Sequence, residues 1–251
     1  MSSRDHATNS PQHKNIDKIK VLFFGRSKCE ATDRAIDYLN RLDFEITTVK
    51  SNGRGESLPA DIAGWSGEYI FCFRSLFVLP KHILDSAKIA AINFHPGPAE
   101  YPGSGCLNFA LYENAKEYGV TAHIMTEKVD DGSILECRRF PIFAGDTVNS
   151  LLERTHLKLL DLLFDTVGGI GVSGRSYINE LLNKSNHEKW IGEAHRMKEL
   201  ETLSVVDIGV SASELERVIR ATHTESFPTK IKLHGYEFLL SSPQKKQILS
   251  R

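Results

Sequence analysis

The sequence has few cysteines, no long hydrophobic run and no excess of charge of either sign. Its four cysteines lie far apart and form no CxxC pair, which argues against a disulfide framework or a zinc knuckle and favours reduced thiols. No run approaches the ~18 apolar residues of a membrane span. Lysine and arginine number 31 against 32 aspartate and glutamate, which argues against a partner bound mainly through neutralisation of its phosphates.

The first sixteen residues, 1–16, are polar and carry no hydrophobic period, which predicts a flexible tail. They also lack the basic-then-apolar order of a signal peptide, so we expect a cytoplasmic protein. The length of 251 residues predicts one large domain, or a domain with an appendage, that buries a substantial core. These features are typical of a globular enzyme.

Short apolar runs alternate with helically spaced segments through the first two thirds of the chain. The runs at 19–24 and 89–94 are continuously apolar, as in strands buried on both faces, and helical spacing follows the first at 30–42. This alternation predicts an α/β fold with a Rossmann-like, mainly parallel sheet. Further strands are expected at 44–49, 69–73, 120–125 and 134–140, and further helices at 82–88, 106–118 and 146–164.

The glycine-rich segment 168–174 predicts a flexible break after the long helix. We therefore expect a catalytic domain over 17–168 and a small C-terminal α+β subdomain over 175–251. Within the latter, apolar periodicity predicts a helix at 212–221. A hairpin is expected between 230 and 240, around His234 and Gly235.

Residues suited to chemistry gather where the run at 89–94 ends. Asn93 and His95 lie two apart, so both side chains would point to the same side of a strand, and Pro96 and Gly97 end that strand at once. Open α/β sheets bind ligands at the carboxyl ends of their strands, which favours a functional reading of His95 over a packed one.

A carboxylate partner for His95 is available at Asp130, in the turn between two expected strands. A nearby carboxylate raises the basicity of an imidazole, while an amide can donate to a developing oxyanion. Asn93, His95 and Asp130 would suit acyl transfer without a serine or cysteine nucleophile. Two alternatives stay open: Asp130 and Asp131 form only a turn, or His95 and Asp130 hold a metal, although no metal-ligand spacing is present. His123 is interpreted as a packed or supporting residue.

Three blocks of this sequence, INFHPGPAEYPGSG (92–105), GVTAHIMTEKVDDGSIL (119–135) and FRSLFVLP (73–80), resemble the signature segments of the folate-dependent formyltransferases. The resemblance covers about residues 18–165 with order and spacing preserved. It implies transfer of a formyl group from N10-formyltetrahydrofolate to an amine, by a one-carbon group transferase that needs no metal.

The resemblance also implies roles for single residues. Asn93 would polarise the formyl oxygen, His95 would act as a general base or stabilise the intermediate as imidazolium, and Asp130 would orient His95 and relay protons. The folate would contact the block 73–80 and the loop before Asp130, at Phe77, Val78, Leu79, Thr126, Glu127 and Val129.

The length of the chain and its charge bear on which amine is formylated. Purine-pathway members are shorter, methionyl-tRNA formyltransferases carry a longer C-terminal barrel, and the net charge of −1 lacks the basic bias of a tRNA-binding protein. What remains resembles the sugar N-formyltransferases of lipopolysaccharide O-antigen biosynthesis. Their acceptors are nucleotide-linked amino sugars, and we expect a dTDP-linked amino-dideoxy sugar, with GDP or UDP as alternatives. The segment 215–227 is similar to one found after the catalytic domain of such enzymes.

Acceptor contacts are expected at two places. The turn after the first strand brings cations to a helix N-terminus, which favours anions, and the loop after His95 opens toward the cleft. The residues concerned are Arg26, Ser27 and Lys28 in the turn, and Tyr101, Ser104, Cys106 and Asn108 after His95. Tyr236 and Phe238 of the hairpin offer a surface for a homodimer. Alternative functions are transfer to methionyl-tRNA or another amine, deformylation of formyltetrahydrofolate and, less favoured, a folate-binding scaffold without activity.

Overall fold

The computed structural model describes residues 18–241, so the tail expected at 1–16 lies outside the described part of the chain. Its centre is a six-stranded sheet in the order β2-β1-β3-β4-β5-β6. The strands are β1 (Ile19–Arg26), β2 (Phe44–Ser51), β3 (Gly67–Phe73), β4 (Ala87–His95), β5 (Glu117–Ile124) and β6 (Ile134–Pro141). The first four pair in parallel and the last two are antiparallel, which confirms the mainly parallel sheet.

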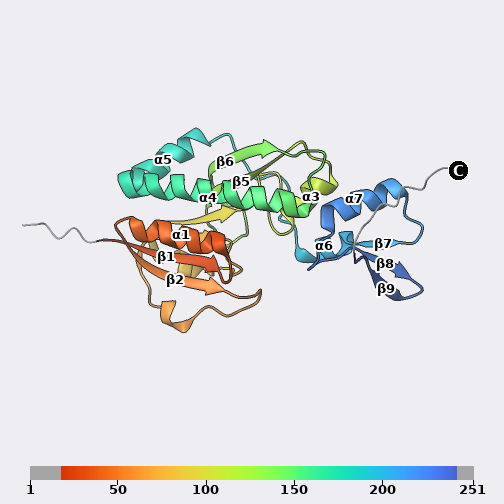
Figure 1. Ribbon diagram of the computed structural model, residues 1–251. Coiled ribbons are helices and arrows are strands. Elements are labelled where there is room, and N and C mark those ends of the chain that lie inside the picture. Colours follow the sequence, from red (N-terminus) through yellow and green to blue (C-terminus); the bar gives the residue numbers. More distant parts are fainter. Residues whose placement is uncertain (1–17, 242–251) are drawn as a thin grey trace, which may run out of the picture.

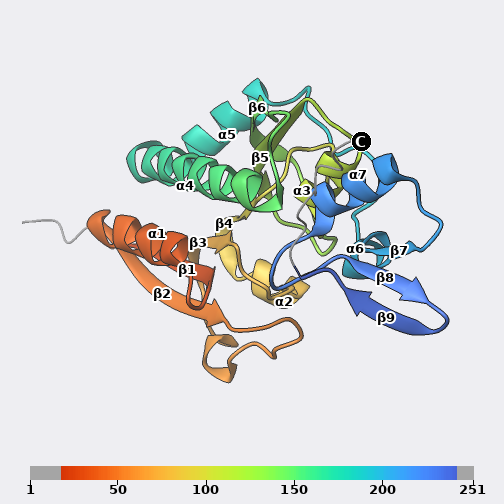
Figure 2. The same cartoon turned by 45° about the vertical axis from the view of Figure 1, so that its right-hand side comes forward.

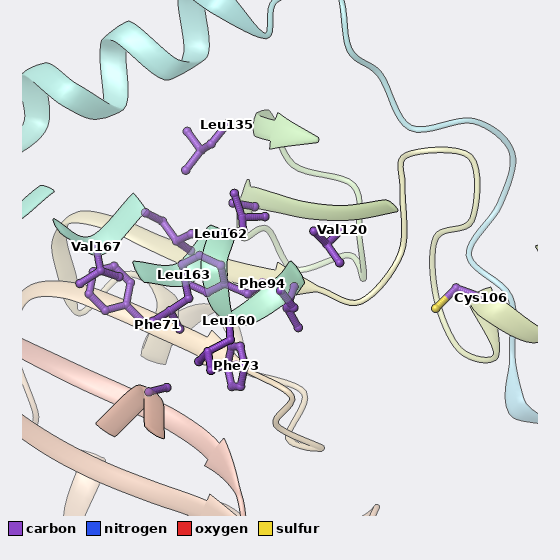
Figure 3. Close-up of a cluster of buried hydrophobic side chains, with 14 of the residues drawn as sticks. Phe71, Phe73, Phe94, Cys106, Val120, Leu135, Leu160, Leu162, Leu163 and Val167 are labelled. Atoms are coloured by element: carbon purple, nitrogen blue, oxygen red, sulfur yellow. The ribbon is translucent and has the colours of Figure 1, made fainter. Parts of the chain in front are cut away.

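Alternate residues of the sheet pack into two separate apolar layers, as the two-residue period of a strand requires. The larger layer lies under α1 (Glu30–Arg41), α3 (Cys106–Tyr112), α4 (Val148–Ser173) and α5 (Arg175–Lys184). Figure 3 shows this layer, with side chains from the strands directed toward α4: Phe71, Phe73 and Phe94 against Leu160, Leu163 and Val167. The smaller layer lies under the short helices α2 (Lys81–Leu84) and η1 (Ala60–Ile62).

The glycine-rich segment 168–174 is not the break that its composition predicts, because α4 continues through it to Ser173. A Cβ on Gly169 would lie 2.3 Å from the ring of Tyr177 on α5, so the glycine allows two helices to approach closely. Ile170 is fully buried in the same stretch. Tertiary packing thus overrides the low helix propensity of glycine, and α5 remains packed with the first domain.

Two expected helices are shorter than their apolar spacing indicates. The helix expected at 106–118 ends at Tyr112, and Asn114 follows with φ of +55°, which ends the helical turn. Tyr118 instead pairs with Phe140 across β5 and β6, where its ring is fully buried. The helix expected at 82–88 ends at Leu84, because β4 begins at Ala87.

The C-terminal part is a small α+β unit beside α3, at the right of Figure 1. It consists of α6 (Met197–Leu203), β7 (Val205–Asp207), α7 (Ala212–Thr222), β8 (Lys230–Leu233) and β9 (Tyr236–Leu239). Its sheet has the order β7-β8-β9, so the expected hairpin is confirmed, whereas β7 has no counterpart in the sequence prediction. In Figure 2 this hairpin extends away from the larger sheet. None of the helices within residues 18–241 combines the length and apolarity that crossing a bilayer demands.

Candidate active site

The carboxyl end of β4 carries Asn93 and His95 at the centre of the sheet. Both face the same side, and Pro96 and Gly97 turn the chain away directly after them. The His95 ring is buried, with 3% of the residue exposed. Its Nδ1 lies 3.1 Å from Oδ2 of Asp130, and its Nε2 lies 3.0 Å from the carbonyl oxygen of Tyr101. Because a carboxylate and a carbonyl only accept hydrogen bonds, both nitrogens of His95 must donate, so this geometry is that of an imidazolium.

Asp130 lies in the turn between β5 and β6, at the left-handed φ of +48°. Such a conformation is unfavourable for a residue other than glycine and is often maintained at functional sites. The backbone N–H of Gly103 donates to its Oδ2 at 2.8 Å. The carboxylate is thereby held by a backbone donor of the loop after β4 as well as by His95.

His123 on β5 completes this group. Its Nδ1 lies 2.9 Å from the carbonyl oxygen of Ile124 and therefore donates. Its Nε2 lies 3.1 Å from Nδ2 of Asn93 and 3.2 Å from Oδ1 of Asp130. As a neutral ring His123 accepts from the amide, and as a cation it donates to the carboxylate. Of the two interpretations of His123, packed or supporting, these contacts with Asn93 and Asp130 favour the supporting one.

Burial and charge act on His95 and Asp130 in opposite directions. Burial lowers the pKa of His95, but Asp130, Cys106 and the Tyr101 carbonyl outweigh it and raise the pKa to about 9. Burial raises the pKa of Asp130, but His95, His123 and the Gly103 N–H outweigh it and lower the pKa to about 2. At neutral pH the site therefore contains a buried imidazolium–carboxylate pair.

The side chains of this group open into a cavity of about 370 Å³ at the carboxyl ends of the parallel strands. The expected folate contacts all line it: Phe77, Val78, Leu79, Thr126, Glu127 and Val129. Val78 is 72% exposed and Val129 52% exposed, so apolar side chains border its mouth. The backbone N–H groups of Val78 and Leu79 have no hydrogen-bond acceptor within the described residues. Apolar edges with free backbone donors suit a flat, polar-edged heterocycle such as a pterin.

The lining also includes Arg26 after β1, Arg54 in the β2–β3 loop and Arg74 after β3. In the strand order these elements precede β4, so we call this part of the lining the arginine end, and the part around Asn93, His95 and Asp130 the Asn93 end. None of these guanidinium groups pairs with a carboxylate among residues 18–241, whereas Arg138 and Arg139 on β6 both do. Nη1 of Arg74 lies 2.9 Å from Sγ of Cys29.

His156 reaches the same end of the cavity from α4. Burial, followed by the charges of Arg74 and Arg26, lowers its pKa to about 4, so the ring is neutral at neutral pH. This part of the cavity presents unpaired positive charge and one neutral imidazole.

The expected acceptor contacts are only partly brought to the cavity. Arg26, Ser104 and Cys106 line it, whereas Ser27 and Lys28 in the turn before α1 do not. Tyr101 contributes its carbonyl to His95, but its hydroxyl donates to Glu113 at 2.8 Å.

Asn108 does not face the cleft, contrary to the sequence expectation. It is buried, and its Nδ2 donates to the carbonyl oxygen of Ala221 on α7 at 2.7 Å. The helix α3 turns this side chain toward the C-terminal unit, so Asn108 joins the two parts of the fold.

Several residues of the site were not foreseen from the sequence. Arg74 directly follows a strand, where ligands bind in open α/β sheets, and this position was the available signal. His156 had no such signal, because it lies far along the chain from Asn93. The same holds for Trp190, whose ring packs edge-to-face against His95. Among residues 18–241, no cluster of three or more histidine, cysteine, aspartate or glutamate side chains is arranged to hold a metal ion.

Comparison with known families matches the part of the chain that forms this site. The formyl transferase family model aligns with residues 19–167, which is more than half of the chain. The match ends inside α4, so it includes Asn93, His95, Asp130 and the cavity lining up to His156, but not Trp190.

Individual relatives are more distant. The chain is similar to methionyl-tRNA formyltransferase of Listeria monocytogenes, with 34% identity over 91 residues, 36% of this chain and only 29% of that protein. In fold it is similar to a sugar N-formyltransferase from Shewanella, with a TM-score of 0.64 and 19% identity, over 91% of this chain and 99% of the other. It is also similar to the N-formyltransferase from Helicobacter canadensis in complex with folinic acid and dTDP-3-aminofucose, with a TM-score of 0.62 and 14% identity, over 86% of this chain and 85% of the other.

Proposed function

The chain belongs to the formyl transferase family, whose members use folate to transfer one-carbon groups, and on this premise we propose that it formylates the amine of a nucleotide-linked amino sugar. N10-formyltetrahydrofolate is the proposed donor. The observation that carries the proposal is the division of one cavity into two ends, an Asn93–His95–Asp130 end and an arginine end. The first supports the chemistry and the second supports the class of acceptor.

The donor fits the apolar end of the cavity. Val78 and Leu79 offer free backbone N–H groups, and the loop from Thr126 to Val129 lines the same cavity. When bound there, the folate supplies the formyl group to be transferred. This chain's residues exclude water and hold that group beside Asn93 and His95.

The protein's own groups meet the charge that develops on the formyl oxygen. The amide nitrogen Nδ2 of Asn93 lies 3.1 Å from Nε2 of His123 and 3.4 Å from Oδ1 of Asp130. The second hydrogen bond is the longer and weaker one, so we propose that its hydrogen is donated to the oxyanion instead. The Nε2–H of His95, now 3.0 Å from the Tyr101 carbonyl, supplies a second donor with full positive charge. Charged hydrogen bonds are shorter and stronger than neutral ones. His95 therefore enters the reaction as imidazolium. We propose that it gives its Nε2 proton to the folate nitrogen as the C–N bond to the formyl group breaks, and regains a proton from the amine that has formed the new C–N bond.

The arginine end favours an acceptor with a phosphate or diphosphate. Guanidinium groups bind phosphate oxygens in a two-pronged geometry, and Arg26, Arg54 and Arg74 have no protein carboxylate to satisfy them. Arg26 and Arg54 are exposed and Arg74 is half-buried, so all three cations around the cavity of about 370 Å³ are open to a polyanionic ligand. The dTDP-3-aminofucose bound by the Helicobacter canadensis protein is such a ligand, and we propose dTDP as the carrier here.

The test is incubation of the purified protein with 10-formyltetrahydrofolate and a panel of dTDP-, GDP- and UDP-linked amino sugars. We expect a product heavier by one formyl group with at least one sugar, detected by mass spectrometry, and none with the His95→Asn variant. Absence of any formylated sugar would refute the proposed acceptor.

Methionyl-tRNA is the second candidate acceptor, favoured by the 34% identity to the Listeria monocytogenes protein over 91 residues. The same assay with charged initiator tRNA separates the two. Formylated methionine without any formylated sugar would assign this function instead. Release of formate without an acceptor would indicate a formyltetrahydrofolate deformylase.

A further inference from the structure

The segment 188–196, here called the strap, follows α5 and runs along the loop that leaves His95. The N–H of Ile191 donates to the carbonyl of Ala99 at 2.9 Å. The N–H of His195 donates to the carbonyl of Pro102 at 3.0 Å, and the N–H of Ser104 donates to the carbonyl of His195 at 2.8 Å. The strap is therefore hydrogen-bonded to the active-site loop at both of its ends.

Gly103 connects the strap to the catalytic carboxylate. It has φ of +89°, and a Cβ at this position would lie 2.4 Å from the carbonyl oxygen of His195. Its N–H donates to Oδ2 of Asp130 at 2.8 Å. Only glycine fits between the strap and the carboxylate, so the strap determines where this hydrogen-bond donor lies.

Trp190 of the strap contacts the catalytic group directly. Its ring meets His95 edge-to-face, with centroids 5.5 Å apart, and His123 in the same manner at 5.0 Å. Its Nε1 donates to the carbonyl of Gly132 at 2.8 Å, two residues after Asp130. One indole thus holds two imidazole rings and the turn that carries the carboxylate between them.

We propose that Trp190 is a positioning residue of the active site, which shields the His95–Asp130–His123 group from water and fixes the turn of Asp130. The strap lies outside the family match at 19–167, so this chain completes its catalytic centre with a residue from beyond the shared domain. Only the kinetic part of this proposal rests on the proposed function, because the shielding is a property of the free protein.

The physical consequence concerns the charge on His95. The titratable groups that face it are Asp130 in the turn, His123 on β5 and Cys106 on α3, and the strap adds only the indole. Attraction between two charges grows as the dielectric constant around them falls. Water weakens both the penalty of burial and the attraction to Asp130, and a fully solvated imidazole without a partner has a pKa of ~6.5. Removing the Trp190 indole admits water to His95 and therefore moves the pKa of His95 from about 9 toward that value.

The experiment follows the histidine Cε1–H signals by NMR between pH 5 and 10.5 in the free protein. The variants are Trp190→Ala, Trp190→Phe, which keeps an apolar ring but loses the hydrogen bond to Gly132, and Trp65→Phe as a matched control in the second apolar layer. His95→Asn assigns the His95 signal. We expect the pKa of His95 to fall by ~1 unit or more in Trp190→Ala, by less in Trp190→Phe, and not at all in Trp65→Phe.

Activity gives an independent readout. With an accepted sugar, Trp190→Ala should lower kcat ~10-fold or more while the KM for folate stays within about twofold, since Trp190 does not line the donor end of the cavity. An unchanged titration of His95 in a folded Trp190→Ala protein would overturn the proposal. If that variant does not fold, Trp190→Phe decides in the same way. If no acceptor is formylated, the proposed function is refuted, and the NMR titration alone still decides whether Trp190 positions the site.

Discussion

The two ends of the cavity differ in whether the protein satisfies its own charges. At the Asn93 end the reacting side chains have protein partners: His95 and His123 meet Asp130, and Asn93 meets His123. At the other end Arg26 and Arg54 have no side-chain partner among the described residues, and Arg74 has only the thiol of Cys29. The reacting groups are therefore arranged before any ligand binds, whereas the charges of the arginine end are left to be neutralised by a bound ligand.

Removing the hydrogen-bond donors Asn93 and His95 should have the largest effect on the rate of formyl transfer. Asn93→Ala and His95→Asn each delete one donor to the oxyanion, and such a loss typically lowers the rate ~10²–10³-fold. We expect this loss in kcat, with folate affinity nearly unchanged, measured by steady-state kinetics and by titration of the folate. Arg34→Ala, an exposed change on α1, is the control. Rates near those of the wild type would show that the buried group is not the reaction centre.

Removing a cation from the arginine end should weaken binding of the acceptor rather than slow the chemical step. Arg54→Ala and Arg74→Ala each delete a guanidinium group from the phosphate end. Hydrogen bonds to charged groups contribute ~1.5–3 kcal/mol, so we expect the KM for the acceptor to rise ~10–100-fold. The KM for folate should stay constant, and Arg34→Ala should change neither. An increase in the KM for folate alone would show that the arginine end binds the folate tail and not the acceptor.

The charge of His95 predicts an alkaline limit to the reaction. Because its pKa is raised to about 9, the imidazolium persists through neutral pH and is lost above that value. We expect kcat to fall ~10-fold for each unit of pH above 9 if the cation stabilises the oxyanion. A general base at this position would instead make the rate increase through the same range.

The same ionisation should appear in stability, without any acceptor. A histidine whose pKa is raised on folding stabilises the protein below its unfolded pKa of ~6.5, and this contribution is lost as the pH rises through the folded pKa. The folded pKa is about 9, so the melting temperature should fall between pH 6.5 and 9 more steeply in the wild type than in His95→Asn. Equal slopes for the two proteins would contradict the buried ion pair.

Asn108→Ala should have the smallest effect on transfer. Its amide joins α3 to the C-terminal unit through Ala221 and contacts neither end of the cavity. Loss of a buried hydrogen bond costs ~1–3 kcal/mol, so the melting temperature should decrease while both KM values stay unchanged. Ser104→Ala, a change in the cavity lining, is the matched comparison. A selective increase in the KM for the acceptor in Asn108→Ala would show that this residue contributes to acceptor binding.

The local sequence was sufficient for the residues that end strands and form turns. Asn93, His95 and Asp130 could be recognised because a two-residue period, a Pro-Gly turn and an Asp-Asp-Gly turn are visible in the residues themselves. His123 was interpreted as packed or supporting, since a histidine within a strand is usually structural. The run 168–174 was expected to break the chain, but its helix depends on the ring of Tyr177, which no local pattern reveals.

The strands, the residue types at the carboxyl end of β4 and the family to which they point could all be inferred from the local sequence. These follow from short-range rules, because hydrophobic period and turn chemistry act over a few residues. Which charges are paired, which remain unpaired and how Trp190 covers the site emerge in the folded protein alone. Charge attraction and the cost of burial depend on distance and on the surrounding dielectric, and residues 60 or 95 positions apart acquire both only when the chain has folded.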